Sequence, residues 1–205
     1  MLKIGLTGGI ASGKSLASRY FGELGIEIVD ADLIAHDLFK SGSPHLSPLR
    51  EHFGDSIFSV DGALIRKELG KRVFSDPDEL EWLNNLTHPI INKQMQNQLA
   101  QVNSAYAILD IPLLVDVHGS IPAHLGQLLD RVLVIATDLP TQVERLMQRD
   151  SIYHNEAIRI INTQSSWCQK LSLADDVIKN DTSKENLKDN VAKLHEQYLK
   201  LANEF

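Results

Sequence analysis

Eight consecutive residues of this 205-residue chain have the types and spacing of a phosphate-binding loop. Residues Gly8–Ser15 read Gly-Gly-Ile-Ala-Ser-Gly-Lys-Ser, with the second glycine, lysine and serine where this pattern requires them. Glycines let the backbone curl so that successive N–H groups point at phosphate oxygens. Lys14 brings a positive charge to the β- and γ-phosphates, and Ser15 supplies a hydroxyl for Mg²⁺. The pattern predicts a nucleoside triphosphate site.

The residues around the loop favour a real site over a chance match. The apolar run Lys3–Leu6 precedes it and is typical of a buried strand, and apolar residues at helical spacing follow it. A helix that begins near Gly13 directs its positive end at the same anion. The residues expected to hold the nucleotide are Gly8, Gly9, Ile10, Ala11, Ser12, Gly13, Lys14 and Ser15. The loop alone does not name the reaction, because switch proteins, motors and small-molecule kinases all carry it.

Two aspartates follow the next predicted strand, in the segment Val29-Asp30-Ala31-Asp32. In a doubly wound fold this place adjoins the phosphate loop, so a carboxylate here can face the γ-phosphate. Because a helix begins at this point, we expect one aspartate to cap it and Asp32 to act in chemistry. Asp32 could accept the proton of an acceptor hydroxyl and help to hold Mg²⁺ through water. The alternative is that both aspartates only cap the helix.

Two other acidic residues could belong to a nucleotide site, one of them to a guanine-nucleotide switch. Asp110 ends the apolar run 107–109 and could be a carboxylate near Mg²⁺, although this signal is weak. Asp116-Val117-His118-Gly119 matches the Asp-x-x-Gly element of such switches. Their second element, Asn-Lys-x-Asp, has only one near match, at residues 92–95, where methionine replaces the carboxylate within a helical pattern. The sequence therefore disfavours a GTPase.

A second group of cations lies in a helical stretch from Leu139 to about Gln164. Arg145 and Arg149 are four residues apart and share one helix face. Arginines over a phosphate site indicate a closing lid that neutralises the transferring group. The alternative is a solvated face on which they pair with Glu144 and Asp150.

Histidine and cysteine give no transition-metal site. His88 precedes Pro89, where it can be satisfied by backbone or can contact a substrate. Cys168 is the only cysteine, which excludes an internal disulfide and a cysteine-based metal cluster. Mg²⁺ held mainly by the nucleotide is sufficient.

The element order predicts an α/β fold, a doubly wound parallel sheet with helices on both faces. Five apolar runs read as its strands: Lys3–Leu6, Glu27–Asp30, Tyr106–Ile111, Arg131–Ile135 and Asp176–Lys179. A final amphipathic helix from Ser183 to about Leu201 covers the sheet.

The interval between the second and third strands is too long for a simple crossover and reads as an inserted helical subdomain. Its helices are expected at Asp32–Phe39, Pro44–Phe53, Leu64–Phe74, Asp78–Leu86 and Pro89–Val102. We therefore expect a single domain, with a core at about 1–31, 105–138 and 170–205, an insert at 32–104 and a lid at 139–165.

The amino-acid composition limits the classes of molecule that this chain is expected to bind. A net charge of −7 disfavours nucleic acid and anionic membranes, which leaves small-molecule substrates. The sequence has no signal-peptide pattern and no apolar run of membrane-spanning length, so we expect a soluble, cytoplasmic protein. We expect a monomer or a weak homo-oligomer.

Taken together, these segments resemble the dephospho-coenzyme A kinase family over nearly the whole chain. The matching segments are 5–15, Val29–Asp32, Thr87–Pro89, Ile111–Leu114, Gln148–Asp150 and Ala174–Ile178. The resemblance implies that ATP, with Mg²⁺, phosphorylates the ribose 3′-hydroxyl of dephospho-coenzyme A to give coenzyme A and ADP, the last step of coenzyme A synthesis. It also implies a P-loop architecture like that of nucleoside-monophosphate kinases, in which the inserted helices bind the acceptor.

The resemblance also implies residue roles. Lys14 and Arg149 would stabilise the transferring phosphoryl group, and Asp32 would be the base. His88, Asp32 and Leu113 would contact the acceptor. Two other readings share the loop: a nucleoside or nucleotide kinase, and a nucleotide-dependent regulatory or assembly module.

Four positions depart from the family pattern. Ala11 stands where glycine is usual, which is tolerable only if its φ is negative. Asp116 stands in place of a glutamate, so any contact it makes must be reached differently. Trp167 and Lys170 occupy positions where arginines are common, and lysine lacks the planar fork of arginine.

Overall fold

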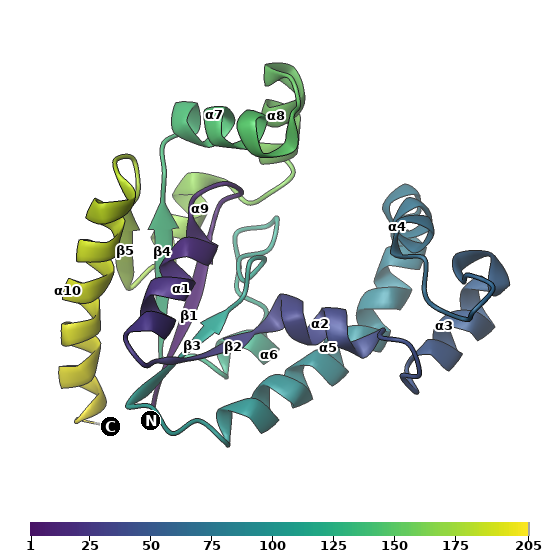
Figure 1. The fold of residues 1–205 in the computed structure, drawn as a ribbon, viewed down its shortest axis with the longest axis horizontal. Coiled ribbons are helices and arrows are strands. Elements are labelled where there is room, and N and C mark those ends of the chain that lie inside the picture. Colours follow the sequence, from purple (N-terminus) through teal and green to yellow (C-terminus); the bar gives the residue numbers. More distant parts are fainter. Residues whose placement is uncertain (205) are drawn as a thin grey trace. The chain divides into compact units, whose positions relative to one another are not determined.

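The computed structural model describes residues 1–204, which form two compact units (Figure 1). The first unit contains residues 1–30 and 98–204, and the second is the continuous segment Ala31–Asn97. Each unit is described by itself below.

A five-stranded, all-parallel sheet in the order β2-β3-β1-β4-β5 forms the centre of the first unit. Its strands are β1 (Leu2–Gly8), β2 (Glu27–Asp30), β3 (Tyr106–Asp110), β4 (Arg131–Ala136) and β5 (Asp176–Lys179). β1, β3 and β4 are almost wholly buried, as expected of strands covered on both faces. The predicted fold class is confirmed, and β2 and β5 have the predicted bounds.

Helices cover one face of the sheet, and a segment with a short helix lies against the other. Leu2, Ile4 and Leu6 pack on one face against α1 (Lys14–Glu23) and α10 (Lys184–Ala202). On the other face, Leu114 and Leu129, from the segment that contains α6 (Ala123–Gly126), lie against Gly5. α10 begins where predicted, because Ser183 caps it by accepting a hydrogen bond from the Asn186 amide. None of the helices in residues 1–204 is long and apolar enough to cross a membrane.

The predicted stretch from Leu139 to about Gln164 forms two helices, α7 (Leu139–Asp150) and α8 (His154–Ile161), separated at Ser151, whose φ is +55°. They lie over the carboxyl ends of the strands, next to the turn between β1 and α1 (Figure 1). A short helix that the sequence analysis did not predict, α9 (Trp167–Ser172), follows them. It is fixed by a capping box between Ser166 and Gln169.

The second unit is helical. Its elements are α2 (Ala31–Leu38), α3 (Leu46–Phe53), the 3₁₀ turn η1 (Asp55–Ile57), α4 (Arg66–Ser75) and α5 (Pro77–Leu99), which continues into the first unit. A separate core of six buried apolar side chains holds it together, namely Leu49, Phe53, Ile57, Phe58, Leu69 and Val73.

The prediction of two helices, ending at Leu86 and starting at Pro89, was wrong, because α5 runs through Pro89 without a break. A proline inside a helix removes the hydrogen bond to the carbonyl four residues earlier, here that of Asn85. Pro89 and Asn85 are both exposed, so water can bond to this carbonyl. A proline on the solvent side of a long helix is therefore a poor indicator of a helix end.

Candidate functional site

The phosphate-binding pattern Gly8–Ser15 forms the turn between β1 and α1. Gly13 is the N-cap of α1, with φ +92°, a conformation that L side chains rarely adopt. A side chain at this position would also collide with the Asn180 amide, which lies 2.2 Å from where the Cβ would be. Lys14 and Ser15 occupy the first helical turn, where backbone N–H groups have no acceptor within the helix. The turn therefore presents the positive end of α1.

Two side chains from the sheet fix the peptide group before Gly13. Asn180, just after β5, donates its Nδ2–H to the Ser12 carbonyl at 2.7 Å, and the Thr137 hydroxyl, just after β4, donates to the same oxygen at 3.0 Å. In a trans peptide the C=O and N–H groups point in opposite directions. Holding the Ser12 carbonyl against the sheet therefore directs the Gly13 N–H away from it. The Gly13 amide is therefore oriented before any anion binds.

A buried ion pair lies beside the turn. The Lys14 ammonium donates to the Asp110 carboxylate at the end of β3, and their side chains are only 15% and 4% exposed. Asp110 is level with Leu6 of β1 in the sheet register. The sequence signal for Asp110 was weak, since an acid at the end of an apolar run is common. The structure makes it the direct partner of the loop lysine.

The Ser12 hydroxyl is a second mark of a ligand site. Ser12 is 1% exposed, and its Oγ is one of two buried side-chain polar atoms without a hydrogen-bond partner in residues 1–204, the other being Asn92 Oδ1. Buried polar groups in proteins almost always have a partner, in the protein, in water or in a ligand. An unpaired hydroxyl inside the turn therefore fits a loop that a ligand completes.

The geometry of the turn agrees with comparisons to known proteins. The family model "Dephospho-CoA kinase" matches residues 2–186. The chain belongs to the dephospho-CoA kinase family. It is 42% identical over 202 residues to a dephospho-CoA kinase of Salmonella choleraesuis (strain SC-B67), covering 98% of this chain and 95% of that one. This confirms the predicted resemblance and the interpretation of the chain as the kinase of the last step of coenzyme A biosynthesis.

Two solved structures have a similar fold, and one of them is named as a member of this family. Dephospho-CoA kinase from Campylobacter jejuni superposes with a TM-score of 0.70 at 28% identity, over 97% of both chains. TT1252 from Thermus thermophilus superposes with a TM-score of 0.80 at 27% identity, over 96% of this chain and 97% of that one. The dephospho-CoA kinase assignment also excludes the GTP-switch reading. Asn92–Met95, the near match to a guanine-specificity loop, lies inside α5.

The backbone conformation at Ala11 is not the one expected from the sequence. A negative φ was expected for a tolerated alanine, but φ at Ala11 is +59°. This left-handed conformation brings the Cβ too close to the following carbonyl oxygen and costs roughly 1–2 kcal/mol in an L-residue. A glycine at this position would avoid this strain.

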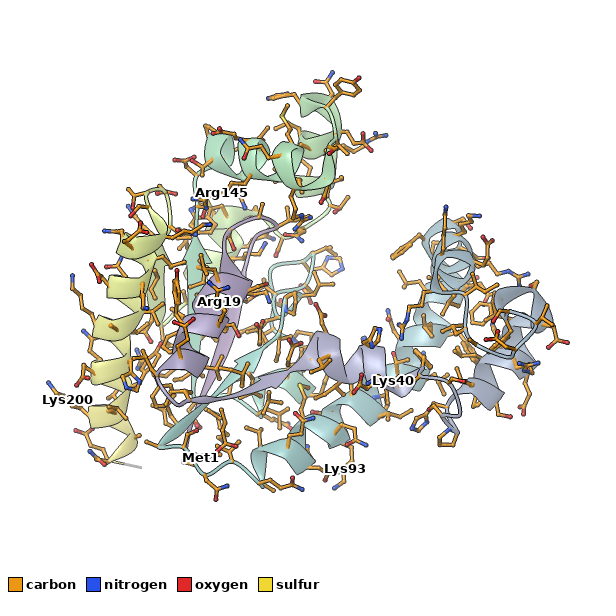
Figure 2. All side chains as sticks on the ribbon, viewed as in Figure 1. Met1, Arg19, Lys40, Lys93, Arg145 and Lys200 are labelled. Atoms are coloured by element: carbon orange, nitrogen blue, oxygen red, sulfur yellow. The ribbon has the colours of Figure 1, made fainter. Side chains whose placement is uncertain are left out.

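Arg145 and Arg149, the predicted lid arginines, lie close to the face of α7 that meets the phosphate loop. Gln142 Nε2 donates to the Ile10 carbonyl at 2.9 Å, so its side of α7 faces the loop. Arg145 and Arg149 follow at three and seven residues, close to the same helix face. Figure 2 shows Arg145 on the side of α7 toward the carboxyl ends of the strands.

Arg149 has a neighbour as its partner in this structure. It makes two hydrogen bonds to Asp150, of 2.7 and 2.8 Å, as the alternative reading predicted. These bonds raise the pKa of the Arg149 guanidinium and lower that of the Asp150 carboxyl. Both side chains are partly exposed, so solvent screens the pair and its contribution to stability is small.

Two of the predicted acceptor residues, Asp32 and His88, belong to the helical unit. Asp32 is in the first turn of α2, where a carboxylate is favourable, and His88 is on the exposed side of α5. The third, Leu113, is in the loop after β3 of the first unit and is 68% exposed. Leu113 therefore belongs to a different unit from Asp32 and His88.

The helical unit contains a pocket of about 450 Å³ between α2, α4 and α5, which the sequence analysis missed. Phe39, Phe74 and other apolar side chains form much of its lining, with Asp32, Arg66 and Asn84 among its polar groups. Arg66 is held in place by a 2.6 Å hydrogen bond to the His36 carbonyl. Apart from Asp32, no sequence motif marks these residues, because they converge only when three helices pack.

The remaining departures have local roles. One Asp116 carboxylate oxygen accepts hydrogen bonds from the amides of His118 and Ser120, each 2.9 Å long, so Asp116 shapes its own loop. Lys170 is 4% exposed and donates to the Ser165 carbonyl at 2.5 Å, and burial lowers its pKa. Trp167 is half-buried at the start of α9. Neither residue reproduces the fork of an arginine.

The turn also fits Mg²⁺ that arrives with a nucleotide. Magnesium commonly keeps several waters and takes its other ligands from phosphates and one or two protein oxygens. Ser15 is exposed on the first turn of α1, so its hydroxyl is accessible to such an ion. Across residues 1–204, no group of three or more histidine, cysteine, aspartate or glutamate side chains is placed to hold a metal by itself.

Proposed function

We propose that the turn Gly8–Ser15 holds the phosphates of Mg-ATP and that the γ-phosphoryl group passes from there to the ribose 3′-hydroxyl of dephospho-coenzyme A, leaving ADP. The family assignment supports the reaction. The observation that carries the location is the oriented turn with its buried Lys14–Asp110 pair, because it offers fixed N–H donors and a charge at one point.

Lys14 can bind a phosphate while its ion pair with Asp110 stays in place. An ammonium has three N–H donors, so it can bridge the Asp110 carboxylate and a phosphate oxygen at once. This arrangement keeps a nearly inaccessible carboxylate paired while the phosphates are bound. Arg149, and Arg145 beside it, would add positive charge to the transferring group from α7, once Arg149 exchanges Asp150 for a phosphate.

When bound, Mg²⁺ would supply charge neutralisation between the β- and γ-phosphates. Ser15 would contribute a hydroxyl ligand to it, and Asp32 would reach it through water. The remaining ligands would come from phosphate and solvent oxygens.

Asp32 would take the proton of the acceptor hydroxyl as that oxygen forms its bond to the γ-phosphorus and the bond to the ADP oxygen breaks. Its place in the chain supports this role. Asp30 at the end of β2 is level with Asp110 in the sheet register, and Asp32 follows two residues later. The competing role, stabilising the first turn of α2, requires no contact with substrate.

The pocket of the helical unit would bind part of the acceptor. Its volume of about 450 Å³ lies in the range of small-ligand sites, and it combines aromatic walls with a few polar groups. Asp32 lines it, so an acceptor held there is next to the proposed base. His88 and Leu113 remain proposed acceptor contacts on the strength of the resemblance.

The Asp32→Asn variant tests the assignment of the base. It preserves shape and removes proton acceptance, so ATP affinity should stay within about twofold while single-turnover transfer falls about 100-fold or more. Asp37→Asn is the matched control, because Asp37 is an exposed carboxylate on the same helix. Transfer by Asp32→Asn at a rate close to that of the control would leave Asp32 with only its role at the start of α2.

A further inference from the structure

Ile10 of the phosphate loop is held from two sides by glutamines of the lid region. Its N–H donates to Gln164 Oε1 at 3.0 Å, and its carbonyl accepts from Gln142 Nε2 at 2.9 Å. Gln142 is on α7 and is 7% exposed, and Gln164 follows α8. One residue of the loop is thus tied to both ends of the α7–α8 pair.

These two bonds set the orientation of two peptide groups. The Gly9–Ile10 peptide is fixed by Gln164 on its N–H and by the Ser12 amide on its carbonyl, at 3.1 Å. The Ile10–Ala11 peptide is fixed by Gln142 on its carbonyl, which directs the Ala11 N–H to the opposite side. An anion that draws the loop's N–H groups toward itself therefore pulls directly on both glutamines.

Apolar contacts connect the same parts. Ile10 and Ala11 pack against the lid cluster of Val143, Leu146 and Ala157. Ala11 keeps its methyl group there at a φ of +59°, where a glycine would be unstrained.

Gly9 lets the lid approach. The Gln142 Nε2 lies 2.3 Å from where a Cβ at Gly9 would be, so α7 sits directly over the loop backbone. The tip of the loop, residues 9–11, is therefore packed as part of the lid, whereas Ser12 and Gly13 are held by the sheet.

We infer that Gln142 and Gln164 are positioning residues that couple occupancy of the phosphate loop to the order of α7 and α8. Phosphate binding reorients the peptides on either side of Ile10, and the two hydrogen bonds carry that change into the helix that bears Arg145 and Arg149. The inference rests on the proposed placement of the nucleotide phosphates in Gly8–Ser15. It assigns to two amides, which touch no substrate, the task of bringing the lid cations into place.

A pair of matched variants tests the coupling. Gln164→Glu keeps an oxygen acceptor for the Ile10 N–H, whereas Gln142→Glu replaces the donor to the Ile10 carbonyl with an acceptor. Both changes keep side-chain length and add the same negative charge, so both weaken nucleotide affinity by repulsion. Gln148→Ala, an exposed glutamine on α7, is the neutral control.

The readout is hydrogen exchange of the full-length chain with and without Mg-ADP, each variant at its own saturating concentration. In the unmodified chain and in Gln148→Ala, Mg-ADP should slow exchange in α1 and in α7–α8. Gln164→Glu should retain both effects. In Gln142→Glu, Mg-ADP should still slow exchange in α1. The factor by which it slows exchange in α7–α8 should be at least about fivefold smaller than in the unmodified chain.

Two outcomes would overturn the coupling: equal slowing of α7–α8 in both glutamate variants, or α7–α8 in the unmodified chain that does not respond to bound Mg-ADP. Failure of the proposed nucleotide placement would look different, because Mg-ADP would then bind without slowing exchange in α1. If Gln142→Glu does not fold, Gln142→Met, which has similar size and no donor, takes its place with the same expectation.

Discussion

In the phosphate loop the groups prepared for a ligand are mainly backbone amides, whereas in the pocket of the helical unit they are side chains. The loop amides are oriented from outside, by Asn180 and Thr137 on the sheet side and by Gln142 and Gln164 on the lid side. The helical pocket depends on side chains such as Phe74, which is 83% exposed.

The two sites should therefore respond differently to substitution. A site built from backbone amides loses affinity when the side chains that orient those amides are removed, even though these side chains touch no ligand. In a pocket built from side chains, each substitution removes only the contact of that side chain. Substitutions should therefore have larger and less local effects on nucleotide binding than on acceptor binding.

The largest effect is expected from Lys14→Ala. It removes the charge that we propose acts on the transferring phosphate, and it leaves the Asp110 carboxylate, 4% exposed, without its partner. We expect kcat/KM to fall about 10²–10³-fold, measured as acceptor-dependent ADP release, and stability to fall by about 3 kcal/mol, measured by urea unfolding.

The double variant Lys14→Ala/Asp110→Ala separates the two effects. Removing both charges should restore most of the stability without restoring turnover, because a buried unpaired charge is costly but a missing pair is not. Recovery of turnover in the double variant would mean that Lys14 serves only to neutralise Asp110.

Asn180→Ala tests a support that contacts no substrate. Loss of the 2.7 Å hydrogen bond to the Ser12 carbonyl frees the Ser12–Gly13 peptide, so the KM for ATP should rise about tenfold, with the KM for the acceptor unchanged. Asn190→Ala, a half-buried asparagine on α10 that bonds to Asn186 and not to the loop, is the control. An unchanged KM for ATP would show that the loop keeps its geometry without this support.

Phe74→Ala tests the pocket of the helical unit. An exposed aromatic at the pocket should contribute about 1 kcal/mol to acceptor binding, so the KM for dephospho-coenzyme A should rise about fivefold while the KM for ATP stays constant. Val60→Ala, a fully exposed apolar residue outside the pocket, should change neither constant. A rise in the KM for ATP alone would count against the pocket as an acceptor site.

The smallest effect is expected from Ala11→Gly. Relief of the positive φ should stabilise the fold by up to about 1 kcal/mol, a rise in Tm of a few degrees, measured by calorimetry. A fall in Tm would mean that the Ala11 methyl contributes more through its contact with the lid cluster than its backbone strain costs.

The sequence predicted correctly those features that depend on residues close together in the chain. Apolar runs placed β2 and β5 correctly, and the spacing of Gly8, Gly13 and Lys14 located the turn, because the composition of a buried strand and the backbone of a phosphate loop leave direct marks. Pro89 misled, since its effect depends on which side of α5 faces water.

Residues whose role depends on distant parts of the chain escaped prediction. Asp110 received little weight because its importance comes from pairing with a lysine 96 positions away, and Gln142 reaches Ile10 across 132 positions. The lining of the helical pocket likewise comes from three helices. Such convergence follows from packing, and no pattern at a fixed spacing carries it.

The proposed transfer is tested by measuring ADP release from Mg-ATP with and without dephospho-coenzyme A, with the product identified by mass and by the site of its new phosphate. We predict release that depends on the acceptor, and one added phosphate on the ribose 3′-hydroxyl. Binding of ATP without any stimulation by dephospho-coenzyme A, or a phosphate placed elsewhere, would contradict the proposed transfer.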